Sequence, residues 1–145
     1  MKTLLAIDDD VGIQKQLKWS LTDYELVVAD DRSSAMQQMR RYEPLVVTLD
    51  LGLPPDPTNA SEGLACLAEI LQHKPDCKVI VITGSTDTEH ALKAIGLGAY
   101  DYYQKPIDVD VLNVIVERAF KLAELEAENR ALKQSNVKQQ DIIGN

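Results

Sequence analysis

The sequence predicts an α/β fold: an open, parallel sheet with helices on both faces. Four short runs rich in Val, Ile and Leu do not alternate apolar with polar residues, which suits strands buried on both faces. Amphipathic stretches with helical spacing separate these runs, as in strand–helix units. At 145 residues, 45% hydrophobic and 26% charged, the chain has the size and balance of one globular domain with a short appendage.

The expected elements form five strand–helix units in a row. Strands are expected at Leu4–Ile7, Leu26–Ala29, Leu45–Leu49, Val79–Ile82 and, in a shorter and more aromatic run, Ala99–Tyr103. Helices are expected at Val11–Leu21, Arg32–Tyr42, Ser61–Gln72, Thr86–Leu97 and from Val109 onward. Right-handed crossovers between parallel strands then place helices on both faces of the sheet.

Apolar residues at helical spacing mark each of these expected helices. In chain order they are Ile13, Leu17 and Leu21; Ala35, Met36 and Met39; Leu64, Leu67, Ile70 and Leu71; and Ala91, Leu92 and Ile95. Gly96 and Gly98 are a stop signal for the fourth helix. Trp19, in the first helix, is interpreted as a packing residue.

The net charge of −8 is unevenly distributed. Residues 1–116 hold 10 basic and 18 acidic residues, whereas residues 117–145 hold 5 of each, so we expect a boundary near residue 117. Such an acidic domain is not expected to bind nucleic acid. Cys66 and Cys77 lack the spacing of a disulfide framework or a metal site. With no signal peptide and no apolar run near the roughly 20 residues of a membrane span, a cytoplasmic protein is expected.

Polar side chains follow four of the expected strands. Asp8–Asp10 follow the first strand, Asp50 the third, Thr83 the fourth and Lys105 the fifth. Each has an ordinary explanation on its own; Asp10, for example, suits the N-cap of the first helix. In a sheet of order 2-1-3-4-5, however, these strand ends converge at one edge, where such folds bind ligands. The sequence therefore predicts one site built from all of them.

The chemistry of this predicted site is that of phosphoryl transfer. Clustered carboxylates repel one another unless a positive charge lies between them. Oxygen ligands suit a hard cation, and Mg²⁺, which keeps several of its waters, fits best. A carboxylate nucleophile beside Mg²⁺ and an ammonium group is equipped to accept a phosphoryl group.

Four separated motifs resemble the receiver domain of bacterial two-component response regulators, over residues 3–120. In chain order they are Leu5–Asp10, Val46–Pro54, Val81–Gly84 and Gly98–Pro106. The resemblance implies a flavodoxin-like (βα)5 fold with strand order 2-1-3-4-5. It also implies a regulatory phosphoacceptor that catalyses only its own phosphorylation and dephosphorylation, rather than an enzyme.

The resemblance assigns the acidic residues their roles. Asp50 would accept a phosphoryl group from a sensor histidine kinase. Asp9 would bind Mg²⁺ directly and Asp8 largely through water, with Asp50 and the backbone carbonyl of Gly52 as further ligands. Phosphatases of similar fold need an acid–base Asp two residues after the nucleophile; that position is Gly52 here, which argues against a phosphatase.

The resemblance also assigns the residues that respond to the phosphoryl group. Lys105 and Thr83 would contact its oxygens, and a cis bond is expected between Lys105 and Pro106. Thr83 would move on activation while Tyr102, the switch aromatic, turns inward. Strand alternation puts the adjacent Tyr103 on the opposite face, so only one of the two tyrosines can be the switch.

The loop from Leu53 to Gly63 is about five residues longer than is usual after the acceptor in the family. Three of the chain's six prolines lie in Pro54–Pro57, so a rigid, extended loop is expected. It is either a tolerated surface insertion or a loop that shapes access to Asp50 or kinase recognition. Shortening it is expected to leave folding intact. A similar loop occurs in regulators associated with PEP-CTERM and exopolysaccharide clusters.

The tail contains a short heptad pattern. Leu122, Leu125, Asn129 and Leu132 would form the seam of a two-stranded, parallel coiled coil. With about two good heptads, the alternative is a single exposed helix that continues the last helix of the receiver. The expected organisation is a receiver at 1–118, a coiled-coil linker at 119–140, and the start of a further domain at 141–145.

The final residues, Ile142-Ile143-Gly144, resemble the start of the AAA+ ATPase domain of sigma-54-dependent activators, the nitrogen-regulatory class. We therefore expect a homodimer, formed by the last helices and the linker, that regulates downstream ATPase and DNA-binding domains. The alternative is a pseudo-receiver that acts as a dimerisation module without phosphorylation. The presence of Asp8, Asp9, Asp50, Thr83 and Lys105 argues against this alternative, because a scaffold has no need of them.

Overall fold

The computed structural model describes residues 1–54, 60–84 and 88–143, with side chains as far as Lys133. Its parallel strands form a five-stranded sheet in the order β2-β1-β3-β4-β5, which confirms the predicted fold class and strand order. The strands are β1 (Lys2–Ile7), β2 (Tyr24–Ala29), β3 (Val46–Asp50), β4 (Lys78–Thr83) and β5 (Asp101–Gln104). The helices are α1 (Val11–Ser20), α2 (Arg32–Tyr42), α3 (Ser61–His73), α4 (Thr88–Leu97) and α5 (Val109–Ile143).

Several strands extend beyond their predicted apolar runs into polar residues. Lys2 pairs with Tyr24, Asp50 with Ile82 and Thr83 with Gln104. The ladder uses backbone groups, so a polar side chain at a strand end does not stop the pairing. Asp50 and Thr83 are therefore the last residues of their strands, held by the sheet rather than by a loop.

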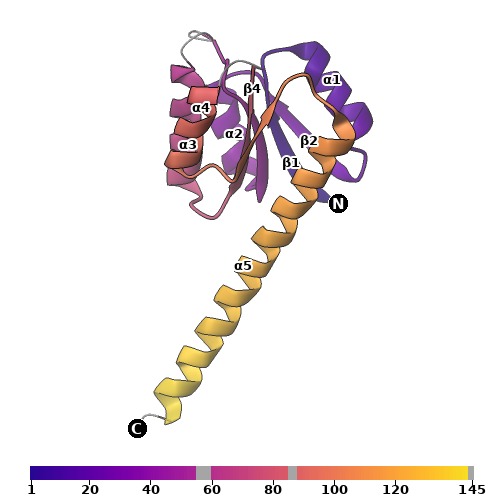
Figure 1. Cartoon of the computed structure of the whole chain (residues 1–145). Helices are drawn as coiled ribbons and strands as arrows, with labels where there is room; N and C mark the ends of the chain where they lie inside the picture. Colours follow the sequence, from indigo (N-terminus) through magenta and orange to yellow (C-terminus); the bar gives the residue numbers. More distant parts are fainter. Residues whose placement is uncertain (55–59, 85–87, 144–145) are drawn as a thin grey trace.

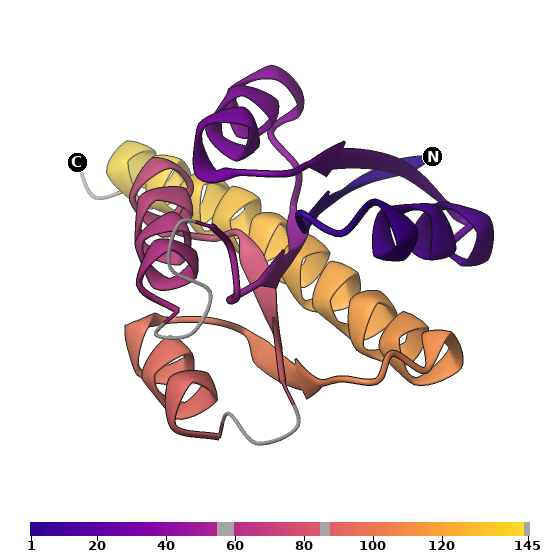
Figure 2. The same cartoon turned by 90° about the horizontal axis from the view of Figure 1, so that it is seen from above.

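Two cores lie on the two faces of the sheet. α1 and α5 cover one face, and α2, α3 and α4 cover the other (Figures 1 and 2). Met36 and Met39 are buried, as predicted. The packing prediction for Trp19 is wrong: the residue is 83% exposed. Leu17 takes the buried position of α1, and Trp19, two residues later, lies well round the helix from it.

Local signals explain how the loops at the carboxyl edge begin and end. The Asp10 carboxylate caps α1 by accepting hydrogen bonds from the backbone N–H groups of Gly12 and Ile13. The Lys105–Pro106 bond is cis, as expected. At the start of α3, a Cβ on Gly63 would lie 2.5 Å from the Cα of Leu51, so only glycine allows this helix to approach the residue that follows Asp50.

α5 is much longer than the other helices and leaves the domain at the amino edge of the sheet (Figure 1). Its first turns are buried through Leu112, Val116, Ala119, Phe120 and Ala123. Beyond them, three ion pairs, which we name the ion-pair strap, join α5 to residues at the amino edge of the sheet. The nitrogen–oxygen distances are 2.7 Å for Lys2–Glu124, 2.7 Å for Lys78–Glu126 and 2.8 Å for Arg130–Asp76.

Some of the predictions fall on residues that the structure does not describe. Residues 55–59 of the proline-rich loop, and Thr86, the expected start of the fourth helix, lie outside the described residues. Of the expected start of a further domain, 141–143 form the last turn of α5, and 144–145 lie outside the described residues. Among the helices described, none is long and apolar enough to cross a membrane.

Candidate functional site

Three carboxylates meet at the carboxyl edge of the sheet. Asp8 and Asp9 follow β1, and Asp50 ends β3, which lies beside β1 in the sheet. One oxygen from each of the three lies within 4.8 Å of the others. Asp8 is 2% exposed and Asp50 6%, whereas Asp9 is open to solvent. The fold thus assembles the predicted acidic cluster. Its exposed member, Asp9, leaves the cluster accessible to a ligand from solvent.

Asp50 is held between a cation and a backbone donor. The ammonium nitrogen of Lys105 lies 3.3 Å from Oδ2 of Asp50. The N–H of Gly52 donates to Oδ1 of the same carboxylate at 2.9 Å. Lys105 reaches it because β5 continues directly into the loop, where the Lys105 N–H donates to the Thr83 carbonyl at 2.8 Å.

Two buried oxygens at the site have no hydrogen-bond partner among the described residues. They are Oδ2 of Asp8 and Oγ1 of Thr83. A buried, unpaired polar atom is costly, and its presence in a native structure indicates a partner such as an ion or a ligand. The carboxylate oxygen suits a cation, and the hydroxyl can donate to an anion. The residues present therefore fit Mg²⁺ and a phosphoryl group.

The electrostatics of Asp8 agree with this fit. The pKa of its carboxyl group is raised from 3.8 to about 7, mainly by burial and also by the charges of Asp50 and Asp9. The N–H of Asp10, which donates to Asp8 at 2.9 Å, and the charge of Lys105 oppose this increase. The site thus carries more negative charge than its surroundings neutralise, and a divalent cation would relieve it.

The two adjacent tyrosines of β5 lie on opposite faces, as strand alternation predicts. Tyr102 is 39% exposed and lies on the outer face of β5. Tyr103 is half-buried against the core between the sheet, α1 and α5. Its hydroxyl accepts a hydrogen bond from the N–H of Asp108 at 2.6 Å. The sequence did not indicate this bond, because nothing in a tyrosine pair shows what its hydroxyl meets.

With this geometry in view, comparison with known proteins identifies the family. Residues 4–117 match the family described as the response regulator receiver domain. The chain belongs to this family. It therefore shares the receiver's place in two-component signalling, in which receivers partner with histidine kinases, and its role is regulatory.

Relatives of the receiver extend the likeness into the long helix. The regulatory protein AtoC of Escherichia coli is 31% identical over 134 residues, which cover 91% of this chain. The nitrogen assimilation regulatory protein NtrX of Azorhizobium caulinodans is 34% identical over 133 residues, 90% of this chain. The matched parts are only 28% and 29% of those two proteins. The chain thus spans under a third of the length of these two relatives.

Solved structures agree with the sequence relatives. NtrX from Brucella abortus in complex with ADP superposes with a TM-score of 0.82 at 34% identity, covering 91% of this chain and 30% of that one. The separate receiver domain of the same protein gives a TM-score of 0.74 at 35% identity, covering 81% of this chain and 98% of that one.

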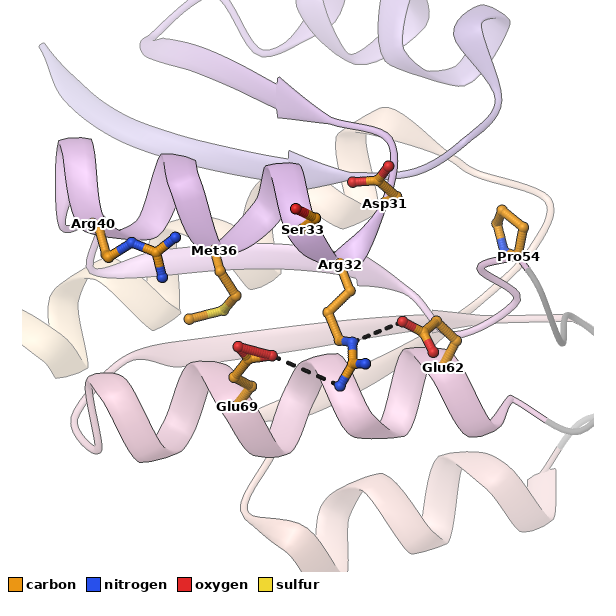
Figure 3. Close-up of a pocket in the computed structure, with 8 residues that line it drawn as sticks. All are labelled: Asp31, Arg32, Ser33, Met36, Arg40, Pro54, Glu62 and Glu69. Carbon is orange, nitrogen blue, oxygen red and sulfur yellow. Dashed lines mark ion pairs between the residues drawn. The ribbon is translucent and has the colours of Figure 1, made fainter.

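A groove of about 660 Å³, whose lining does not include Asp8, Asp9 or Asp50, lies between α2 and α3 (Figure 3). Arg32 of α2 crosses it toward α3, with a guanidinium nitrogen 2.7 Å from Glu62 and another 3.8 Å from Glu69. Sequence reasoning missed this cluster, because the facing sides of two helices are set by tertiary packing. Since Arg32 is matched by acidic partners, we interpret the cluster as a cross-helix brace.

The predicted seam residues lie on one exposed side of α5. Leu122, Leu125 and Leu132 are 38%, 57% and 56% exposed, and Asn129 is also exposed. Leu125 lies well round α5 from Ala119 and Ala123, which are buried, whereas Leu122 lies at the border of that buried face. The domain therefore leaves the seam uncovered.

Proposed function

We propose that this receiver is a phosphorylation-dependent switch of a two-component system, with Asp50 as the phosphoacceptor. The observation that carries the proposal is the position of Asp50. It is buried at the end of β3, beside two further carboxylates and within 3.3 Å of the ammonium group of Lys105. A structural role alone does not account for this costly arrangement of charge.

Asp8, Asp9, Asp50 and the backbone carbonyl of Gly52 would hold Mg²⁺. The ion, when bound, offsets charge on the phosphoryl oxygens during transfer. Lys105 neutralises charge from the other side, and its distance to Asp50 suits a shared contact with a phosphoryl oxygen. Because the N–H of Gly52 occupies Oδ1 of Asp50, we assign Oδ2, which faces Lys105, as the nucleophilic atom.

The transfer itself is a balanced exchange of bonds at phosphorus. Oδ2 of Asp50 donates an electron pair to phosphorus, while the bond from phosphorus to the donor's nitrogen or oxygen breaks. That electron pair leaves with the donor, which is the histidine of a sensor kinase or the acetate of acetyl phosphate. The product is an acyl phosphate on Asp50.

The response starts from Thr83, whose buried hydroxyl has no partner within the described residues. A phosphoryl oxygen on Asp50 would supply that partner and draw Thr83 toward it. Tyr102, now exposed, would then turn inward against the space that Thr83 leaves. A phosphoryl group that binds this second arrangement more tightly shifts the population toward it.

The output is proposed to pass along α5. Residues 1–118 would form the receiver and 119–140 a coiled-coil linker, with 141–145 beginning an AAA+ domain followed by a DNA-binding domain. The exposed seam of Leu122, Leu125, Asn129 and Leu132 supports pairing with a second copy of this cytoplasmic protein. Phosphorylation would alter this dimer and so regulate a sigma-54-type transcriptional activator.

The test is the intact mass of the protein after incubation with acetyl phosphate and Mg²⁺. Wild type is expected to gain one phosphoryl group, and Asp50→Asn none. Asp23→Asn, which changes an exposed aspartate far from the site, is the matched control and should behave as wild type. A chelator should abolish the gain.

Two outcomes would contradict this proposal. A gain of mass in Asp50→Asn would place the acceptor elsewhere. No gain in wild type, from acetyl phosphate or from histidine kinases, would favour the alternative function, a phosphorylation-independent pseudo-receiver. In that case the exposed seam of α5 would carry the function as a dimerisation module.

A further inference from the structure

The hydroxyl group of Tyr103 connects two parts of the proposed switch, the loop that carries Lys105 and the start of α5. It accepts a hydrogen bond from the N–H of Asp108 at 2.6 Å. Its own proton faces two carbonyl oxygens, that of Pro106 at 3.3 Å and that of Asp108 at 3.4 Å, and can serve one at a time. The side chain of Tyr103 therefore spans the loop between β5 and α5, and its hydroxyl binds backbone groups toward the α5 end of that loop.

At one end of this loop is Lys105. Its N–H is fixed by the carbonyl of Thr83 at 2.8 Å, and its ammonium group lies 3.3 Å from Asp50. The next residue, Pro106, offers the carbonyl that the Tyr103 hydroxyl approaches. The backbone of Lys105 is thus held from both sides, by Thr83 before it and by Tyr103 after it.

At the other end of the loop is the start of α5. The Asp108 carboxylate caps the helix by accepting from the N–H groups of Asp110 at 3.0 Å and Val111 at 3.4 Å. The carbonyl of Asp108 accepts from Leu112 at 3.0 Å. Since the N–H of Asp108 is bound by Tyr103, the capping residue of α5 and the loop of Lys105 share one anchor.

We propose that Tyr103 is a positioning residue: its hydroxyl sets the place of Lys105 at Asp50 and couples that lysine to the first turn of α5. This inference rests on the proposed function, since it concerns the same phosphoacceptor site. It assigns the two tyrosines of β5 different tasks. Tyr102, on the outer face, responds to the position of Thr83. Tyr103, on the core side, holds the loop that carries Lys105.

The test compares phosphorylation rates of Tyr103→Phe, Lys105→Ala and the double variant. Phenylalanine fills the same space in the core and lacks only the hydroxyl. Tyr103→Phe is expected to slow phosphorylation by acetyl phosphate about fivefold, the effect of one ordinary hydrogen bond. In the Lys105→Ala background the same change is expected to have no effect, because Tyr103 acts through Lys105. Tyr100→Phe, in the same core just before β5, is the matched control.

Two results would overturn the inference. An unchanged rate in Tyr103→Phe would show that the hydroxyl does not position Lys105. An equal loss in both backgrounds, together with weaker Mg²⁺ binding, would show a merely structural role. Mg²⁺ affinity is the separating readout, because Lys105 is not a proposed ligand and its displacement should leave Mg²⁺ binding in place.

A second readout needs no phosphorylation and so separates this inference from the proposed function. The NMR resonance of the ε-methylene group of Lys105 reports its surroundings in the Mg²⁺-loaded protein. We expect it to differ between wild type and Tyr103→Phe, and to match wild type in Tyr100→Phe. If it is identical in all three proteins, Tyr103 does not position Lys105, whether or not Asp50 is phosphorylated.

Discussion

Arg130 and Asp76 are 54 positions apart in the sequence, yet their side chains meet at 2.8 Å beside the amino edge of the sheet. Arg130 lies beyond the last buried turn of α5, and Asp76 in the turn before β4. With Lys2–Glu124 and Lys78–Glu126, this pair fixes the direction in which α5 leaves the domain. Ion pairs rather than apolar contacts therefore orient this part of the helix.

The ion-pair strap is expected to contribute little to the stability of the whole protein but to hold α5 locally. Glu126→Gln should lower the free energy of unfolding by less than about 1 kcal/mol, as for other surface pairs. It should also speed amide hydrogen exchange over residues 120–133, and added salt should speed exchange in wild type, because exposed charges are screened. Glu128→Gln, two residues after Glu126 and so well round the helix from it, is the control. Equal exchange in both variants would show that the strap does not hold the helix.

Removing the ammonium group of Lys105 should impair transfer without removing the metal site. Lys105→Ala is expected to slow phosphorylation by acetyl phosphate at least about tenfold, because charge on the phosphoryl oxygens is no longer offset. Titration calorimetry should still detect Mg²⁺, since the carboxylates remain. Lys93→Ala, an exposed lysine of α4, should match wild type. Loss of Mg²⁺ binding in Lys105→Ala would contradict the division of roles.

The raised pKa of Asp8 predicts how stability depends on pH. Its pKa of about 7 in the folded protein exceeds the ordinary value of 3.8, so the folded state binds the proton more tightly than the unfolded state. Between pH 4 and 7, the free energy of unfolding contributed by this group falls as pH rises. Since Mg²⁺ must displace the proton, Mg²⁺ should raise the melting temperature more at pH 8 than at pH 5.5.

Asp8→Asn provides the check on this pH effect. Without Mg²⁺, the variant should be more stable than wild type at pH 8, because one buried charge in a repulsive cluster is gone. With Mg²⁺, its melting temperature should rise less than that of wild type. Asp31→Asn, which alters a carboxylate at the N-cap of α2, should keep the wild-type response to Mg²⁺. An equal response to Mg²⁺ in Asp8→Asn would exclude Asp8 from the metal site.

Gly63 is expected to tolerate no side chain. A Cβ there would collide with the backbone of Leu51, which cannot move without disturbing Asp50. Gly63→Ala should therefore lower the free energy of unfolding by about 1–3 kcal/mol. Gly96→Ala is the contrast, because its Cβ would meet nothing within 4 Å, and alanine in a helix is favoured by up to about 1 kcal/mol. Chemical denaturation measures both, and equal shifts would contradict the packing argument.

The exposed seam predicts a dimer that one substitution breaks. Wild type is expected to be dimeric by multi-angle light scattering at micromolar concentration, and Leu125→Glu monomeric, because a charge would enter the apolar seam. Val11→Glu, at a residue of α1 that is 58% exposed, should not alter the mass. A monomeric wild type, with and without a phosphate mimic, would leave α5 as a single exposed helix.

Much of the fold and of the site could be predicted from the sequence, because both depend on strand order. Asp8, Asp50 and Lys105 each follow an apolar run, and parallel strands bring such ends to one edge. The apolar runs also marked all five strands, although they stopped short of polar members such as Lys2.

The contacts between helices could not be predicted in the same way. Arg32 meets Glu62 across α2 and α3, and Arg130 meets Asp76, only because the cores set those helices at particular angles. Trp19 was misjudged for the same reason: the residue type favours burial, but the turn of α1 puts Leu17 inside instead. Periodicity shows that a helix has an inner face; the neighbours of its outer residues follow from tertiary structure.

The length of α5 gives small movements a large geometric gain. The helix is uninterrupted from Val109 to Ile143, and its last buried residue is Ala123. At 1.5 Å per residue, the helix continues roughly 30 Å beyond that point. A tilt of about 5° at Ala123 would thus displace the far end by roughly 2.6 Å, more than the axial rise of a single residue. A rearrangement too small to repack the sheet would therefore still displace Ile143 by a distance comparable to the size of an atom.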